Sequence, residues 1–192
     1  MGLQSDALKQ ERMREFYDTS SYYTEKRGNF SDAANRFKRY SLKNIFSIYY
    51  PSKNEKIIDL GCGWGNISLG LQKRGFDVLS IDYSKQSIEI CKKTARKLGL
   101  DDSRFLCRDA TNTKLKSASF DVAYCADLIE HLYPHIYIDL LKEVHRILKK
   151  GGKLILYAPN PAHYLEILKR NNIILKEDVA HVDYKTIGRV KK

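Results

Sequence analysis

The segment that most constrains the fold is a short apolar run followed at once by three glycines at alternate positions. Residues 57–60 are mostly apolar and β-branched, which is typical of a buried parallel strand. Gly61, Gly63 and Gly65 then allow a tight turn with positive φ angles and a close approach of the backbone to a ligand. A helix is predicted over residues 66–74, and its first amides point toward that ligand.

A second apolar strand, residues 77–82, ends in the acid Asp82. In a doubly wound sheet this carboxylate lies beside the glycine turn, where it can accept hydrogen bonds from both ribose hydroxyls. The two strands and the turn therefore indicate a site for an adenosine-containing cofactor. The spacing disfavours a nicotinamide dinucleotide, because that fingerprint has its third glycine three residues after the second.

The pattern Gly61-x-Gly63-x-Gly65, with Asp59 two residues ahead of it, resembles motif I of the class I S-adenosylmethionine (SAM)-dependent methyltransferases. Further stretches agree with that resemblance in the family's order. They are a third strand over 105–110, a fourth over 120–127, a helix over 140–150 that stops at the glycines 151–152, and a fifth strand over 153–158. Residues 128–132, Leu-Ile-Glu-His-Leu, resemble the ubiquinone/menaquinone-biosynthesis-like branch.

The resemblance covers about residues 55–160 and implies an α/β fold. The expected form is a Rossmann-like, doubly wound parallel sheet of order 3-2-1-4-5, preceded by N-terminal helices. It also implies residue roles. The methionine end of SAM is expected at Asp59, Gly61, Cys62 and Gly63, the ribose at Asp82, the adenine at Tyr83, Asp109 and Ala110, and the methionyl group near Ala126.

Residues 1–50 have helical character and are expected to form a lid, ahead of a SAM-binding domain over 51–192. In the family such an extension commonly closes the acceptor pocket, so Tyr17, Tyr22 and Tyr23 are lid candidates. The alternative, that they are ordinary helix-packing aromatics, stays open.

After the fifth strand too few residues remain for the two further strands that a complete class I domain carries. We therefore expect strands 6 and 7 to be missing and the fifth strand to form an apolar edge. A partner or a second copy, a terminal segment, or a longer form of the protein would cover that edge.

Methyl transfer is an in-line displacement that requires no metal, and a general base matters for a hydroxyl or a protonated amine. His131, just past the fourth strand, is the best-placed base, since histidine titrates near neutrality. A helix-capping or supporting role for His131 is the alternative. His163 and His181 are further candidates at the acceptor pocket.

Composition bounds the remaining alternatives. The N-terminus has no hydrophobic signal core and no apolar run reaches the length of a membrane span, so we expect a cytoplasmic protein without membrane insertion. The four cysteines have no zinc-site spacing and are expected to be free thiols, and Cys62, Cys107 and Cys125 are expected to act as small apolar fillers. The net charge of +11 is scattered, which favours a solvated surface.

The leading hypothesis is methyl transfer from SAM, with S-adenosylhomocysteine as product, to a small molecule. That charge leaves methylation of RNA or another nucleic acid as the alternative. The missing strands leave a non-catalytic SAM-binding subunit as a third hypothesis.

Overall fold

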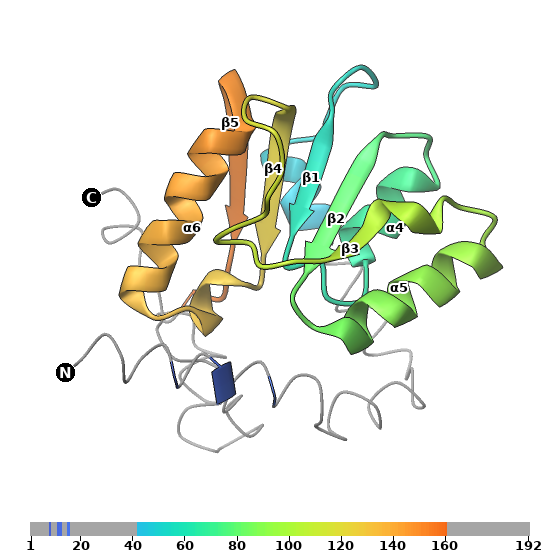
Figure 1. Ribbon diagram of the computed structural model, residues 1–192. Helices are drawn as coiled ribbons and strands as arrows, with labels where there is room; N and C mark the ends of the chain where they lie inside the picture. Colours follow the sequence, from blue (N-terminus) through green and yellow to red (C-terminus); the bar gives the residue numbers. More distant parts are fainter. Residues whose placement is uncertain (1–7, 9–10, 13–14, 16–41, 161–192) are drawn as a thin grey trace.

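The computed structural model describes residues 8, 11, 12, 15 and 42–160 of the 192-residue chain. In this part the strands form one parallel sheet of order β3-β2-β1-β4-β5, as predicted (Figure 1). The elements are β1 (Ile57–Leu60), α4 (Asn66–Gln72), β2 (Val78–Asp82), α5 (Lys85–Lys97), η1 (Asp102–Arg104), β3 (Phe105–Cys107), β4 (Phe120–Ala126), η2 (Ile129–His131), α6 (Pro134–Ile147) and β5 (Leu148–Tyr157).

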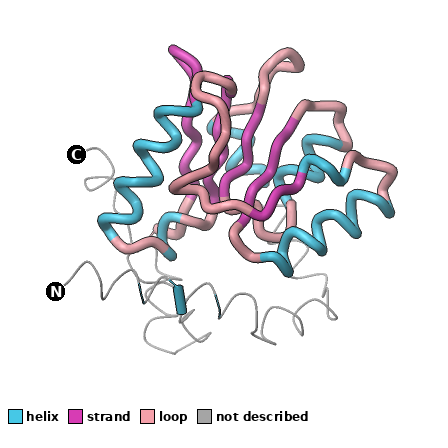
Figure 2. Tube along the Cα trace, in the orientation of Figure 1, coloured by secondary structure: helices cyan, strands magenta, loops and turns pink. Residues whose placement is uncertain are grey.

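Helices pack against both faces of the sheet (Figures 1 and 2). Because side chains alternate along a strand, Ile58 and Leu60 of β1 join the cluster of α6, whereas Ile57 joins that of α4 and of the helical residues 42–48. α5 packs on the α4 side, against Phe105 of β3. With both faces covered, all four residues of β1 are buried, which explains why three of the four are large and apolar.

The last helix and strand differ from the prediction. The helix expected over 140–150 is α6, which begins earlier, with Pro134 in its first turn, and ends at Ile147. The backbone N–H groups of Ala118 and Ser119 donate to the last helical carbonyls, at 3.0 and 2.8 Å. The chain therefore leaves the helix before it reaches the glycines.

Those glycines instead lie inside β5, which starts at Leu148 and bulges. Leu148 pairs with Phe120 and Lys153 pairs with Val122, so the four residues 149–152 lie opposite the single residue Asp121. Gly151 has a φ of 77°, which suits a glycine within the bulge. Among the described residues only β4 borders β5, and what covers its other edge stays a prediction.

Within the same described ranges, no helix combines the length and the hydropathy that crossing a bilayer requires.

Candidate functional site

The glycine turn between β1 and α4 has the geometry that its spacing predicted. Gly61, Gly63 and Gly65 have φ angles of 67°, 50° and 74°. The turn closes through a hydrogen bond from the Gly65 N–H to the Cys62 carbonyl, at 2.8 Å. A Cβ on Gly61 would lie 2.9 Å from the side chain of Leu128, whereas a Cβ on Gly63 would meet no described atom within 4 Å. The backbone at Gly63 is thus the open flank of the turn.

Asp82, the last residue of β2, is joined to this turn. One carboxylate oxygen accepts from the Gly63 N–H at 2.8 Å, and the other accepts from the Ser84 N–H at 2.9 Å. Ser84 in turn caps α5, because its hydroxyl accepts from the Ser87 N–H. The half-buried carboxylate therefore has a fixed orientation at the edge where parallel strands end.

Asp59, two residues before the turn, is 2 % exposed and faces α4, where it accepts a short hydrogen bond from the Ser68 hydroxyl. Burial raises the pKa of Asp59 to about 6, the Ser68 hydrogen bond opposes that rise, and the charge of Asp82 adds to it. Two acids therefore lie close to the turn, and no described cation neutralises Asp59.

The chain that follows β3 lies beside Asp82. The Arg108 N–H donates to the Asp82 carbonyl at 2.9 Å, which extends the pairing of β2 with β3 by one residue. Asp109 is exposed, and one of its oxygens accepts from both the N–H and the hydroxyl of Thr111. Ala110 packs against the α6-side core.

The chain that follows β4 lies on the other side of β1. Ala126 ends β4, and Asp127 then adopts a φ of 51° that turns the chain toward Leu128 over the glycine turn. His131 is the last residue of the short turn η2, half-buried, with its N–H donating to the Leu128 carbonyl at 3.0 Å.

The prediction of apolar fillers is correct for two of its three cysteines, Cys62 and Cys125. Cys62, Cys91 and Cys125 are buried, but Cys107 is exposed at the end of β3, so it is no core filler. Its short strand stops at that residue, and its thiol donates to the Tyr83 carbonyl at 3.4 Å. The hydrogen bond with Cys91 and burial raise the pKa of Cys62 well above that of an ordinary thiol.

The structure brings most of the candidate residues to one edge of the sheet. This edge carries the carboxyl ends of β1 to β4, and it holds Asp59, Gly61, Cys62, Gly63, Asp82, Tyr83, Asp109, Ala110, Ala126 and His131. Tyr17, Tyr22, Tyr23, His163 and His181 lie outside the described residues.

Sequence reasoning missed the residues that support this edge. Ser68 gives no local signal, and Leu128 belongs to the stretch that resembles the family but gives no signal of its contact with Gly61, because each meets its partner only through the fold. Ser84 could have been found, since a serine directly before a helical segment is a usual N-cap.

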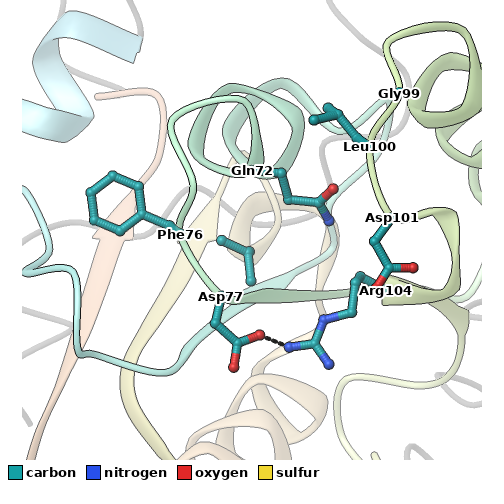
Figure 3. A pocket seen from close by; sticks show the side chains of 8 residues that line it. Gln72, Phe76, Asp77, Gly99, Leu100, Asp101 and Arg104 are labelled. Carbon is teal, nitrogen blue, oxygen red and sulfur yellow. Dashed lines mark ion pairs between the residues drawn. The ribbon is translucent and has the colours of Figure 1, made fainter.

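A separate hollow of about 280 Å³ lies at the opposite edge of the sheet (Figure 3). It is bordered by Gln72 at the end of α4, by Val78 at the start of β2, and by an ion pair of Asp77 with Arg104. Because these residues stand at the amino ends of the strands, the hollow is not part of the glycine-turn site.

Comparison with known proteins agrees with this geometry. A family model described as a methyltransferase domain matches residues 57–152, which is half of the chain. The ubiquinone biosynthesis O-methyltransferase of Pelagibacter ubique is 33 % identical over 111 residues, or 57 % of this chain and 44 % of that protein. The sterol 4-C-methyltransferase strm-1 of Caenorhabditis elegans is 27 % identical over 141 residues, or 73 % of this chain and 38 % of that protein. The chain thus spans less than half the length of these curated relatives.

Among solved structures, the PH0226 protein of Pyrococcus horikoshii OT3 is similar over 83 % of this chain and 68 % of its own. The TM-score is 0.65 and the sequence identity 28 %.

Proposed function

The chain belongs to the methyltransferase-domain family, as a class I SAM-dependent member of the ubiquinone-biosynthesis-like branch, and we propose that it transfers a methyl group from SAM to a small-molecule acceptor. The use of SAM and the transfer of a methyl group follow from the family. The acceptor class, the mechanism and the residue roles are inferred from the site.

The observation that carries the proposal is the fixed pairing of Asp82 with the open flank of the glycine turn. A ligand can approach the Gly63 backbone without meeting a described side chain, and the Asp82 carboxylate beside it is oriented by two backbone amides. A ribose with two vicinal hydroxyls suits a carboxylate in this position. The residues present therefore fit an adenosine-type cofactor.

The remaining cofactor-binding residues are assigned along the same edge of the sheet, at the carboxyl ends of the strands. We infer that Asp59, Gly61, Cys62 and Gly63 surround the methionine end, and that Ala126 borders the methionyl group from β4. We assign the adenine to Tyr83, Asp109 and Ala110. The negative charges of Asp59 and Asp82 favour a ligand that carries positive charge, as SAM does at its sulfur and amino group.

When bound, SAM supplies a methyl group on a positively charged sulfur. The work of the chain is to hold donor and acceptor in line, because alignment lowers the barrier of such a displacement. Where the acceptor is a hydroxyl, His131 is the proposed base that takes its proton, since it follows β4 at the same edge. The alternative, that His131 only supports the turn η2, predicts little loss of rate when it is replaced.

A small acceptor is favoured by the names of the relatives, which point to ubiquinone biosynthesis and to sterol methylation. Acids offset part of the excess of basic residues locally in the described part. Several of these residues are paired with acids: Arg96 with Asp102, Arg104 with Asp77, Arg146 with Glu143 and Lys149 with Asp121.

The first test is the binding of S-adenosylhomocysteine by titration calorimetry to the wild type and to Asp82→Ala. Loss of hydrogen bonds to a charged acceptor is expected to weaken binding on the order of 100-fold. Asp139→Ala, which removes an exposed acid from α6, is the matched control and should bind as the wild type does. Unchanged affinity in Asp82→Ala would refute the ribose assignment.

The second test identifies the acceptor class. The protein is incubated with methyl-labelled SAM and a cell extract, and the label is then counted in the small-molecule and the acid-precipitable fractions. Label in the first fraction supports the proposal, and label in RNA supports nucleic-acid methylation. Binding of S-adenosylhomocysteine without any transfer supports the non-catalytic subunit.

A further inference from the structure

Glu143, on α6, is a buried carboxylate away from the glycine turn. It is 8 % exposed and holds Thr113, a fully buried residue 30 positions earlier in the chain. One Glu143 oxygen accepts from the Thr113 N–H at 2.8 Å and from the Thr113 hydroxyl at 2.5 Å. The guanidinium of Arg146 donates to both Glu143 oxygens, each at 2.7 Å. The carboxylate is therefore held in one orientation and compensated by a cation.

Thr113 links Glu143 to the connection between β3 and β4. Its hydroxyl also accepts from the Leu115 N–H, and its carbonyl accepts from the Arg108 side chain at 2.7 Å. Every polar group of Thr113 is thus paired. The loop is fixed at two points, through Thr113 to α6 and through the Arg108 N–H to the Asp82 carbonyl.

Asp109 and Ala110 lie between these two fixed points. One Asp109 oxygen accepts both hydrogen bonds from Thr111. The other, Oδ2, has no partner among the described residues, and the same local turn fixes its orientation. A displacement of Thr113 would therefore move the carboxylate to which we assign the adenine.

We propose that Glu143 is a positioning residue: through Thr113 it sets the place of Asp109 and thereby the preference of the site for an adenine over a 6-oxo purine. This inference rests on the function proposed above. An exocyclic amino group donates to a carboxylate, whereas a 6-oxo group would face it with an acceptor, so the preference depends on where that carboxylate lies. A residue that only stabilises the fold would weaken both ligands alike.

The test compares the affinities of S-adenosylhomocysteine and S-inosylhomocysteine, measured by calorimetry on the full chain. The wild type should prefer the adenosyl ligand, and Glu143→Gln should reduce the ratio of the two affinities about tenfold, which is the loss of one hydrogen bond. Thr113→Val keeps the Thr113 N–H bond to Glu143 and should reduce the ratio by a smaller factor. It serves as the milder variant should Glu143→Gln fail to fold.

Ser117→Ala is the matched control, because it removes only the contact between Ser117 and Arg146 at the outer side of the same network. Its ratio should equal that of the wild type. A wild type that binds both ligands equally, or variants that lose affinity for both by one factor, would overturn the role of Glu143 while leaving SAM binding intact. A wild type that binds neither ligand would overturn the proposed function itself.

Discussion

Two buried carboxylates, Asp59 under the glycine turn and Glu143 behind the β3–β4 loop, have opposite electrostatics. Burial raises the pKa of Asp59 to about 6 and the nearby acid Asp82 adds to the rise, against hydrogen bonds from the hydroxyl and the backbone N–H of Ser68. Hydrogen bonding to Arg146 lowers the pKa of Glu143 to about 2, against the effect of burial and with the help of Thr113. Burial alone therefore does not decide the cost of an acid. The ionised Asp59 therefore lowers the stability of the folded chain, whereas the ionised Glu143 raises it.

The largest expected effect is at the turn itself. Gly61→Ala should lower the free energy of unfolding by about 4 kcal/mol, because it combines a positive φ with a Cβ 2.9 Å from Leu128. Gly63→Ala has the same kind of φ but open space, and should cost about 1 kcal/mol. Urea unfolding measures both, and equal losses would show that packing against Leu128 does not matter.

Removal of the stabilising acid comes next. The pKa of Glu143 is lower in the folded chain than the ordinary 4.5, so its contribution is complete above pH 4.5 and is lost as the pH falls toward 2. The shift corresponds to between about 3 and 4 kcal/mol. The stability difference between wild type and Glu143→Gln should lose most of that amount across this range and the remainder below pH 2. A difference that does not change with pH would contradict the ion-pair origin.

Asp59 should behave with the opposite sign. Its folded pKa lies above the ordinary 3.8, so the folded chain binds the proton more tightly and stability falls as the pH rises from about 4 to about 6. The expected loss is about 3 kcal/mol. Asp59→Asn should abolish this loss, because an amide does not titrate, while the amide oxygen can still accept from Ser68. Urea titrations at successive pH values measure the change. A variant that retains the pH dependence would assign it to another group.

The smallest effect is expected one residue before Glu143. Lys142 pairs with Asp139 at 3.0 Å on the exposed face of α6, where water screens both charges. Lys142→Ala should change the free energy of unfolding by less than about 0.5 kcal/mol. A loss of stability as large as that of Glu143→Gln would mean that any change of charge on α6 is costly. The buried pair of Glu143 and Arg146 would then not explain the difference between the two regions.

The sequence predicted those parts of the fold that depend on local pattern. The glycine spacing gave the positive φ angles of the turn, and the series of apolar runs, with the family resemblance, gave the strand order. The end of α6 was predicted wrongly, because residues 118–119 capture its last carbonyls from outside the helix.

The supporting residues of the site were beyond sequence reasoning for a related reason. Glu143 reads as one more polar residue of a helix, and only the packing of α6 brings it to Thr113. Asp59 could be recognised from its place before the glycines, but its raised pKa depends on how deeply α4 covers it.

The bulge of β5 also has a practical use. Residues 149–152 already form an excursion opposite the single residue Asp121, and Gly151 is exposed, while pairing resumes with Lys153 opposite Val122. A short epitope or a fluorophore-bearing peptide inserted at Gly151 would therefore lengthen an existing excursion without shifting the register beyond it. Because the bulge is at the amino end of β5, such a tag would lie away from the carboxyl strand ends that form the glycine-turn site, and it would allow the intact protein to be detected or immobilised without altering that site.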